Sequence, residues 1–403
     1  MIRALDGVRV LDVTQVMAGP FCTMLLCDMG ADVIKVEPPG GDSTRRMPGA
    51  LGTDSPSFNA VNRGKRGIIV DLKQTAGQEV VRRLALASDV VVENYRPGVM
   101  AKFGLGYDKL SQEHPKLVYA SISGYGQTGP SAGKGGFDLV AQGVSGLMSV
   151  TGEAGGPPVK AGLPVTDLGA GLFAVAGILS ALIARARTGR GQQVDTSLVD
   201  AGVALSVWEL TQYFSGRGIP EPLGSAHRMN APYQAVKCSD GYVTIGAAND
   251  RTFRRLCEAL GHPEWGNDPR FGNNAQRVEN RKALAARIEG VMDRQPRSYW
   301  LIRLEEHGVP GGPINDYAEV ASDPHVRARA LVVDTVHPTL GKIKTLGTPI
   351  KLSDTPLIPG RPSPLLGEHT EEVLREVGFS SDEVAELHLS GAVTGNTLGT
   401  GSV

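Results

Sequence analysis

Short apolar segments alternate with helix-like segments through the first 123 residues, and this alternation constrains the fold more than any other feature of the sequence. Val8–Val13 and Asp32–Glu37 have the composition of strands, and Pro20–Met29 between them has that of a helix. The pattern recurs further along, with strands expected at Gly67–Leu72, Asp89–Glu93 and Leu117–Ser123 and a helix at Thr75–Leu86. Strand–helix–strand units of this length join parallel strands. The sequence therefore predicts an open, doubly wound, Rossmann-like α/β domain.

Ligands bind such domains beyond the carboxyl ends of the strands, and those ends carry polar or glycine-rich loops here. The loops are Gln15–Gly19, Glu37–Gly41, the stretch from Lys73, Asn94–Gly98 and Gly124–Gly136. The last loop fits a mobile surface segment and a segment that closes over a ligand equally well. The first loop lacks the G-x-G-x-x-G pattern, so a dinucleotide fingerprint is absent. Basic residues expected near the same ends could together hold phosphates: Arg63, Lys65, Arg66, Lys73, Arg96 and Lys102.

The second half of the chain has a different character and predicts a second domain. Residues 1–215 are expected to form the first part of the large α/β domain, and the polar, glycine-bearing residues 216–231 a linker. Residues 232–325 begin with a hairpin, with Asp240-Gly241 at its turn, and continue as helices, which predicts a smaller α+β domain. Residues 326–393 return to complete the large domain, and 394–403 have the composition of a disordered tail.

Composition and charge exclude several classes of function. A net charge of −1 over 403 residues gives no electrostatic case for binding nucleic acid or an anionic membrane. The four cysteines form no C-x-x-C pair and no zinc spacing, so they predict reduced, buried thiols in a cytoplasmic protein without a metal site. No signal-peptide pattern opens the chain. Leu168–Ala186 approaches membrane-spanning length, but its glycine and alanine content favours a buried helix.

Asp167 opens that apolar segment, and spacing leaves two interpretations of it open. Pro164 makes a turn just before it, and basic residues follow the apolar run, as the helix dipole favours. In the structural interpretation Asp167 is a helix N-cap, which accepts backbone N–H bonds. In the chemical interpretation Asp167 is a carboxylate nucleophile, and the small residues Gly169–Gly171 let a substrate approach.

Long motifs along nearly the whole chain resemble the class III CoA-transferases, also called the CaiB/BaiF family. They include GVRVLDVTQVMAGPFCTMLLCDMGADVIKVEPPGGDSTR, NRGKRGIIVDLK, VVENYRPGVMAKFGLGYD, ISGYGQTGP, PVTDLGAG, TGRGQQVDTSLVDA and PLLGEHTEEVL. Within that family the chain is most similar to succinyl-CoA:glutarate CoA-transferases and their dicarboxylate-using relatives. This closer similarity lies in GSAH, PYQA, DGYVTIGAAND, GVPGGPIND and HPTLGKI.

The resemblance implies a large α/β domain built from both chain ends, a smaller central domain, and a homodimer of two interlocked chains. It implies an acyl-CoA and a carboxylic acid as substrates, with no tightly bound cofactor and no metal. Asp167 matches the nucleophile of the family, and Asp138 and Phe137 match a pair beside the active site. The positions that match CoA contacts are Gln15, Met17, Ala18, Val70, Asp71, Leu72, Lys73, Asn94, Tyr95, Arg96 and Lys102.

This assignment resolves the two interpretations of Asp167 in favour of chemistry. A carboxylate with an ordinary pKa of about 4 is ionised at neutral pH and needs no general base. Asp167 is then expected to form a mixed anhydride with the donor acyl group and next an aspartyl-CoA thioester. Backbone N–H donors are expected near it to stabilise each oxyanion, and Gly124–Gly136 to exclude water.

Two rival functions and one open question remain. An acyl-CoA racemase of the same family needs a histidine where this chain has Phe137, and phenylalanine cannot carry a proton. A catalytically silent CoA-binding paralogue is opposed by the presence of Asp167 and Asp138. Related formyl-CoA transferases have arginines in place of Pro38 and Lys102, His and Gln in place of Gln15 and Met17, and a tetraglycine loop in place of Gly246–Asp250. Candidates for binding the distal carboxylate of an acceptor are Arg45, Arg46, His227 and Arg228.

Overall fold

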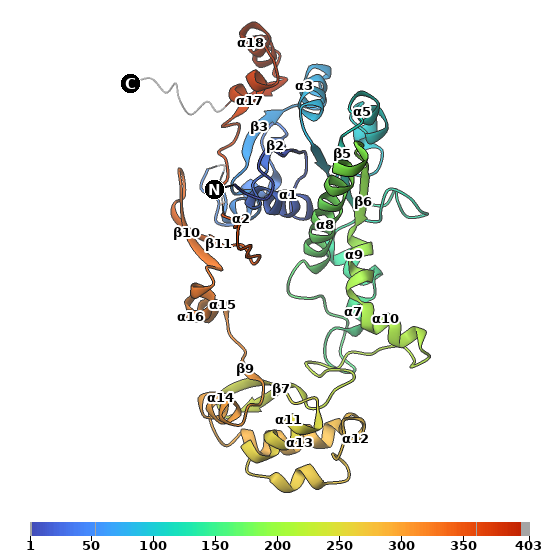
Figure 1. Ribbon diagram of the computed structural model, residues 1–403, viewed down its shortest axis with the longest axis vertical. Helices are drawn as coiled ribbons and strands as arrows, with labels where there is room; N and C mark the ends of the chain where they lie inside the picture. The colour runs from blue at the N-terminus through green and yellow to red at the C-terminus, as the bar shows by residue number, and fades with distance from the viewer. Residues whose placement is uncertain (1, 53, 360, 396–403) are drawn as a thin grey trace. The chain divides into compact units, whose positions relative to one another are not determined.

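The computed structural model describes residues 2–52, 54–359 and 361–395 (Figure 1). The chain divides into two compact units. The first consists of Met1–Leu147, Ala161–Thr211 and Pro324–Val403, and the second of Met148–Lys160 and Gln212–Asp323. The first unit holds a seven-stranded sheet and the second a three-stranded sheet.

The large sheet has the strand order β12-β3-β2-β1-β4-β5-β6. Its strands are β1 (Arg9–Asp12), β2 (Asp32–Glu37), β3 (Arg66–Val70), β4 (Val90–Glu93), β5 (Val118–Ser123), β6 (Gln193–Ser197) and β12 (Val393–Thr394). The first six strands are parallel, whereas β12 pairs antiparallel with β3. The predicted α/β class is confirmed, but the sheet is mixed because the C-terminal segment adds an antiparallel edge. The order reverses between β1 and β4, which is where doubly wound sheets bind ligands.

Helices cover both faces of this sheet because the strands alternate their side chains between two apolar cores. Val10 and Val90 pack against α1 (Ala18–Asp28), α8 (Val165–Thr188) and α9 (Leu198–Leu205). Leu11 and Val91 point to the other face, which is covered by α3 (Thr75–Leu86), α5 (Tyr107–Glu113), α17 (Thr370–Glu376) and α18 (Ser381–Leu389). Each fully buried aliphatic side chain of these cores contributes about 1.5–3 kcal/mol to folding.

Small residues at the start of α8 let it approach its neighbours closely. A Cβ atom on Gly171 would lie 2.8 Å from the carbonyl oxygen of Ala18, so α8 and α1 meet near their N-termini. A Cβ atom on Gly169 would lie 3.1 Å from a methyl carbon of Leu205 on α9. These two glycines therefore let α8 pack closely against α1 and α9.

Helix α8 is also long and apolar enough to cross a membrane by length and composition. In its most apolar 18-residue window 39% is buried within the chain. One such helix is weak evidence for a membrane span, since the core helix of a globular protein passes the same test. Ala170, Ala174, Ile178 and Ala181 form a buried stripe along it, while Leu172 and Ile183 are exposed.

The second unit is built on β7 (Tyr233–Cys238), β8 (Gly241–Gly246) and β9 (Gly311–Pro313), all antiparallel. The predicted hairpin is present, but its turn residues are Ser239 and Asp240, because Gly241 already pairs with Cys238. The helices of this unit include α11 (Asp250–Ala259), α12 (Asn274–Glu279), α13 (Arg281–Met292) and α14 (Arg297–Glu306), with the 3₁₀ helix η2 (Pro263–Asn267). Its own apolar core includes Phe253, Phe271 and Trp300.

The remaining elements are short. Ser206 separates α9 from α10 (Val207–Phe214). The hairpin β10 (Val332–His337) and β11 (Gly341–Leu346) forms a two-stranded sheet of its own. Thr394, assigned to the tail, belongs to β12, and residues 396–403 lie outside the described residues. The others are η1 (Ser43–Arg46), α2 (Pro56–Asn62), α4 (Val99–Lys102), α6 (Asp138–Val144), α7 (Leu147–Val150), α15 (Tyr317–Ser322) and α16 (Pro324–Ala328).

Candidate active site

A cavity of about 270 Å³ lies at the carboxyl ends of β1, β4 and β5, where the strand order reverses. Seven of the residues predicted from the sequence line it together: Gln15, Met17, Ala18, Asn94, Tyr95, Phe137 and Asp167. The other lining residues are Val16, Ile122, Ser123, Gly124, Gly136 and Leu198. A volume of this size suits the reacting end of a larger substrate.

Asp167 lies in the first turn of α8 and is not its N-cap. The helix begins at Val165, with Pro164 at the cap position and no capping side chain on it. Capping comes instead from Asp138 at the start of α6. Its Oδ1 accepts a hydrogen bond from the backbone N–H of Thr166 at 2.9 Å and another from the Thr166 hydroxyl at 2.7 Å. Since Thr166 precedes Asp167, Asp138 fixes the turn that presents Asp167 to the cavity.

The carboxyl group of Asp167 has an unusual electrostatic environment. Burial, together with the nearby charge of Asp138, raises the pKa of Asp167 to about 6. Throughout the part of the chain that the structure describes, no cation forms an ion pair with Asp167. The expectation of an ordinary pKa is therefore wrong, although a group with this pKa is still roughly 90% ionised at pH 7. A partly desolvated carboxylate without a counter-ion is suited to attack an electrophile, because attack disperses its charge.

Hydrogen bonds connect the loops that follow β1 and β4 at the edge of the cavity. The amide of Asn94 accepts from the backbone N–H of Gln15 at 2.9 Å and donates to its carbonyl oxygen at 2.8 Å. The side-chain amide of Gln15 also donates to the hydroxyl of Tyr95 at 3.3 Å. Three predicted residues thus form one connected wall of the cavity.

The N-terminus of α1 forms another wall. Its cap residue is Met17, and no side chain caps the helix. Met17 and Ala18 line the cavity, so the backbone N–H groups of the first turn lie at the site. Gly19 allows this tight entry, since a Cβ atom there would lie 2.3 Å from Cβ of Thr14. The start of α1 therefore lies where the sequence led us to expect backbone N–H donors.

The glycine-rich loop Gly124–Gly136 closes at its base. A Cβ atom on Gly124 would lie 2.7 Å from Cα of Gly136, so only glycines fit where the two arms meet. Both glycines line the cavity. The two ends of the loop therefore meet at the cavity, which is the arrangement that a segment covering the site requires.

The other predicted CoA contacts do not line this cavity. Arg96 lines a separate cavity of about 220 Å³ that also includes Glu93 and Gln127. Burial raises the pKa of Glu93 to about 7. Lys102 ends α4 and is exposed. Val70 ends β3, two strands away from β1, and is buried. Asp71, Leu72 and Lys73 follow it, and Asp71 accepts from the backbone N–H of Lys73 at 3.0 Å.

Three of the predicted phosphate-binding cations are engaged in structural ion pairs. Arg66 begins β3, and so it lies at the opposite edge of the sheet from the cavity. It pairs with Asp32 at 2.7 Å, and Arg63 pairs with Asp28 at 2.6 Å. Lys65 is fully buried. The prediction that Arg63 and Arg66 gather at the ligand-binding edge is wrong, because their charges are engaged in structural ion pairs away from it. The ammonium group of Lys65 does reach the carboxyl end of β1, but it is buried and paired with Asp12 at 2.8 Å.

Arg45 is likewise a structural residue. It is buried, pairs with Glu37 at 2.7 Å and with Asp54 at 3.0 Å, and stacks on the ring of Phe58 at 3.6 Å. Its candidacy for binding an acceptor carboxylate is therefore wrong. Arg46 is exposed and donates to the carbonyl oxygen of Gly40. His227 and Arg228 belong to the second unit.

Sequence reasoning did not single out Val16, Thr166 or Gln142. Val16 lines the cavity, and Gln142 donates to Oδ2 of Asp138 at 2.6 Å. Thr166 directly precedes the predicted nucleophile and was the easiest to find, since a hydroxyl beside an aspartate often bonds locally. Nothing in the sequence marks the other two. Within the described residues no group of three or more His, Cys, Asp or Glu side chains converges as a metal site requires. The four cysteines are free and buried, which agrees with the prediction made for them.

Comparison with known proteins completes the description of this site. The family model described as CoA-transferase family III matches residues 5–370. The chain belongs to CoA-transferase family III. Succinyl-CoA:glutarate CoA-transferase of Homo sapiens is 42% identical to it, over 97% of this chain and 90% of the relative. Succinate–glutarate CoA-transferase of Agrobacterium fabrum is also 42% identical, over 93% and 95%.

A solved structure supports the same assignment. The crystal structure of a CaiB/BaiF family protein from Brucella suis matches with a TM-score of 0.84 and 41% identity, covering 94% of this chain and 100% of that one. The predicted family and enzyme class are thus confirmed: this protein is a family III CoA-transferase. Its homologues include succinyl-CoA:glutarate and related dicarboxylate CoA-transferases.

Proposed function

We propose that this CoA-transferase moves CoA from succinyl-CoA to a dicarboxylate such as glutarate, with Asp167 as the covalent nucleophile. The observation that carries this proposal is the position of Asp167, which lines the cavity at the reversal of strand order and forms no ion pair with any cation among the described residues. The substrates are taken from the names of the relatives from Homo sapiens and Agrobacterium fabrum. A CoA thioester and a carboxylate meet the needs of this site, since an ionised aspartate can attack a thioester without a base.

The proposed reaction proceeds through two covalent intermediates. A carboxylate oxygen of Asp167 attacks the thioester carbon, the C–S bond breaks, and CoA leaves as a thiolate beside a mixed anhydride. The thiolate then attacks the anhydride at the Asp167 carbonyl carbon, and the C–O bond breaks to release the donor acid. This leaves an aspartyl-CoA thioester. The acceptor carboxylate attacks that thioester, and the same steps in reverse release the new acyl-CoA and restore Asp167.

The chain supplies three aids to these steps. The N–H groups at the start of α1 stabilise the oxyanion of each tetrahedral intermediate. Asp138 holds Thr166, and through it the turn that carries Asp167, in position. The loop Gly124–Gly136 covers the anhydride and keeps water away from it.

The cavity is too small for a whole CoA molecule, so the carrier extends beyond it along the strand ends. We propose that Gln15, Met17, Ala18, Asn94, Tyr95 and Phe137 contact the thioester end. Arg96 and Lys102, with the segment Val70–Lys73, then hold the nucleotide end, where cations bind phosphates. CoA is a substrate in this scheme, with no tightly bound cofactor and no metal.

We also propose that the enzyme is a cytoplasmic, interlocked homodimer whose large domain is completed by the C-terminal segment. Apolar side chains that are exposed in the single chain support an extensive contact with a second copy. They include Phe173 on α8, Trp208 and Phe214 on α10, and Val336 and Leu346 on the β10–β11 hairpin. Light scattering of the purified protein tests the dimer. The four free thiols support a reducing compartment, and cell fractionation tests the location.

A transfer assay tests the proposed function. The enzyme is incubated with succinyl-CoA and each of glutarate, itaconate, malate and oxalate, and the new acyl-CoA is measured by chromatography. We expect transfer to at least one dicarboxylate. Exchange of the α-proton of an acyl-CoA without transfer would instead indicate a racemase, in spite of Phe137. Binding of CoA with neither transfer nor exchange would indicate a silent paralogue.

A further inference from the structure

Val16 has a strained backbone at the centre of the candidate active site. Its φ angle is +69°, in the left-handed region that a β-branched residue rarely adopts. Such a conformation costs about 1–3 kcal/mol, and it persists only where surrounding contacts impose it. Val16 lines the cavity beside Asp167 and directly precedes Met17, the cap residue of α1. The strain therefore shapes the entry to the helix whose first turn faces the reacting group.

Side chains from separate elements bond the backbone that leads to this residue. Asp12 accepts from the N–H of Thr14 at 3.0 Å, and Lys35 on β2 donates to the carbonyl oxygen of Thr14 at 2.9 Å. Asn94 binds both backbone groups of Gln15, as described above. Oδ2 of Asp42 accepts from the N–H of Val16 at 3.2 Å. Every backbone polar group from the Thr14 N–H to the Val16 N–H thus bonds to a side chain.

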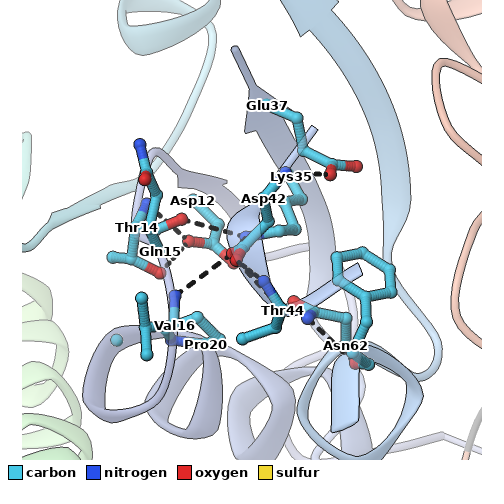
Figure 2. Close-up of polar contacts among 12 residues, drawn as sticks. Asp12, Thr14, Gln15, Val16, Pro20, Lys35, Glu37, Asp42, Thr44 and Asn62 are labelled. Atoms are coloured by element: carbon cyan, nitrogen blue, oxygen red, sulfur yellow. Dashed lines mark hydrogen bonds and ion pairs between the residues drawn. The ribbon is translucent and has the colours of Figure 1, made fainter. Parts of the chain in front are cut away.

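Two of these side chains form a fully buried ion pair. Nζ of Lys35 lies 3.3 Å from Oδ2 of Asp42, and both side chains are 0% exposed. Figure 2 shows Asp42 between Lys35 and the backbone of Val16. The other carboxylate oxygen of Asp42 is held by the backbone N–H of Thr44 at 3.0 Å and by its hydroxyl at 2.8 Å. Asp42 therefore has one orientation, which fixes the position of the acceptor for Val16.

A buried ion pair is a poor way to stabilise a fold, because desolvation offsets most of its attraction. This pair makes hydrogen bonds to the cavity loop, which apolar residues of the same size could not make. Lys35 and Asp42 each direct one hydrogen bond to the backbone of the cavity loop, on either side of Gln15. This geometry is better suited to holding the cavity loop in position than to stabilising the fold.

We propose that Asp42 and Lys35 are positioning residues for CoA transfer. They hold Thr14–Val16 in its strained conformation, so that the side chain of Gln15 and the first-turn N–H groups of α1 stay aligned with the thioester attacked by Asp167. This inference rests on the proposed function for the identity of the reaction. The reason for the alignment is general, since a displacement of about 1 Å at a reacting centre can cost on the order of 10²-fold in rate.

The variant Asp42→Asn tests the proposal. It keeps the shape of the side chain but removes the charge that holds Lys35. We expect kcat for transfer from succinyl-CoA to fall on the order of 10²-fold, with a smaller change in KM because most of the proposed CoA contacts lie on other segments. Hydrogen exchange at the Val16 amide, followed by mass spectrometry without substrate, should become faster.

Asp28→Asn is the matched control. Asp28 ends α1 at the helix terminus away from the cavity, and it forms a buried ion pair with Arg63 at 2.6 Å. This variant should lower thermal stability as Asp42→Asn does, with kcat unchanged. If Asp42→Asn loses stability like the control but keeps its kcat, the ion pair is only structural and the proposal is overturned.

Val16→Gly separates positioning from folding. Glycine adopts positive φ without strain, so this variant should fold at least as stably as the wild type. We expect its kcat to fall nevertheless, since the loop gains other conformations, and an unchanged kcat would contradict the proposal. A wild-type enzyme without any CoA transfer would refute the proposed function. The inference would then stand or fall on hydrogen exchange at Val16, which requires no substrate.

Discussion

Two groups of carboxylates lie near the same cavity, one fully buried and the other half-buried, and their neighbours give them opposite properties. Asp12 and Asp42 lie among Lys35 and Lys65, all of them fully or almost fully buried. Burial alone would raise the pKa of Asp12, but the two lysines outweigh it and hold that pKa well below its usual range. Around Asp167 burial acts with a second carboxylate, Asp138, and the pKa rises to about 6.

The difference shows how one sheet edge combines rigidity with reactivity. A carboxylate that is surrounded by cations is fixed in place and chemically inert, which suits a support for the cavity loop. When a carboxylate beside a like charge is protonated or acylated, the repulsion between the two charges is removed and the free energy falls, which suits a nucleophile. Four predictions test this contrast, in order of decreasing expected effect.

The largest effect should come from removing the nucleophile. Asp167→Ala should lower kcat for CoA transfer on the order of 10⁴-fold, because no other carboxylate lines the cavity among the described residues. CoA binding, measured by calorimetry, should persist. Transfer at an undiminished rate would show that Asp167 is only a structural residue of α8.

Removing a lysine from the buried group around Asp12 should lower the stability of the fold more than it lowers activity. Nζ of Lys65 donates to Asp12 at 2.8 Å, to Asn62 at 2.8 Å and to the carbonyl oxygen of Pro20 at 3.0 Å. Lys65→Met leaves Asp12 buried with less positive charge around it, and the free energy of unfolding should fall by about 3–5 kcal/mol.

A surface ion pair provides the control for that variant. Lys344 pairs with Asp334 at 3.1 Å with side-chain exposures of 66% and 52%. Lys344→Met should lower the free energy of unfolding far less than Lys65→Met does, because solvent screens the exposed pair. Similar losses from Lys65→Met and Lys344→Met in urea titrations would contradict the structural role assigned to the buried group.

The pair of carboxylates should control the pH dependence of the reaction. Protonated Asp167 is no nucleophile, so kcat/KM of the wild type should fall as the pH drops through about 6. Asp138→Asn removes the second cause of the raised pKa and leaves burial, the first cause, in place. The acid limb of the pH profile should then shift to lower pH. An unchanged limb would mean that Asp138 does not influence Asp167 electrostatically.

The smallest expected effect is the change in the free energy of unfolding when Asp167 loses its charge. Because folding raises the pKa of Asp167, the stability that its protonation provides is present below its unfolded pKa and is lost as pH rises through about 6. Asp167→Asn should therefore be more stable than the wild type at pH 7.5, by on the order of 1 kcal/mol. The difference should shrink toward pH 4. Thermal melts at the two pH values measure it, and a constant difference would contradict the raised pKa.

Local patterns predicted the large sheet well, because buried parallel strands appear as short apolar runs whatever surrounds them. The bounds Asp32–Glu37 for β2 and Thr75–Leu86 for α3 agree with the structure. What local patterns lacked were contacts between distant segments. The antiparallel pairing of Val393 with Val70 is of this kind.

The same distinction applies to the candidate site. Gln15, Asn94 and Asp167 lie in recognisable motifs, and the structure brings them to one cavity. The strained backbone of Val16 could not be predicted, since valine does not favour a positive φ and distant side chains impose it. The ion pair of Arg66 with Asp32 could not be predicted either, because a cation in a sequence gives no sign of the carboxylates that the fold places around it.

The central claim is that Asp167 becomes covalently modified, and trapping the intermediate tests it most directly. The enzyme is incubated with succinyl-CoA, treated with hydroxylamine or borohydride, digested, and analysed by peptide mass spectrometry. The account predicts a modified residue at Asp167, formed only when succinyl-CoA is present and absent from Asp167→Asn. An unmodified Asp167 in an enzyme that transfers CoA under the same conditions would contradict it.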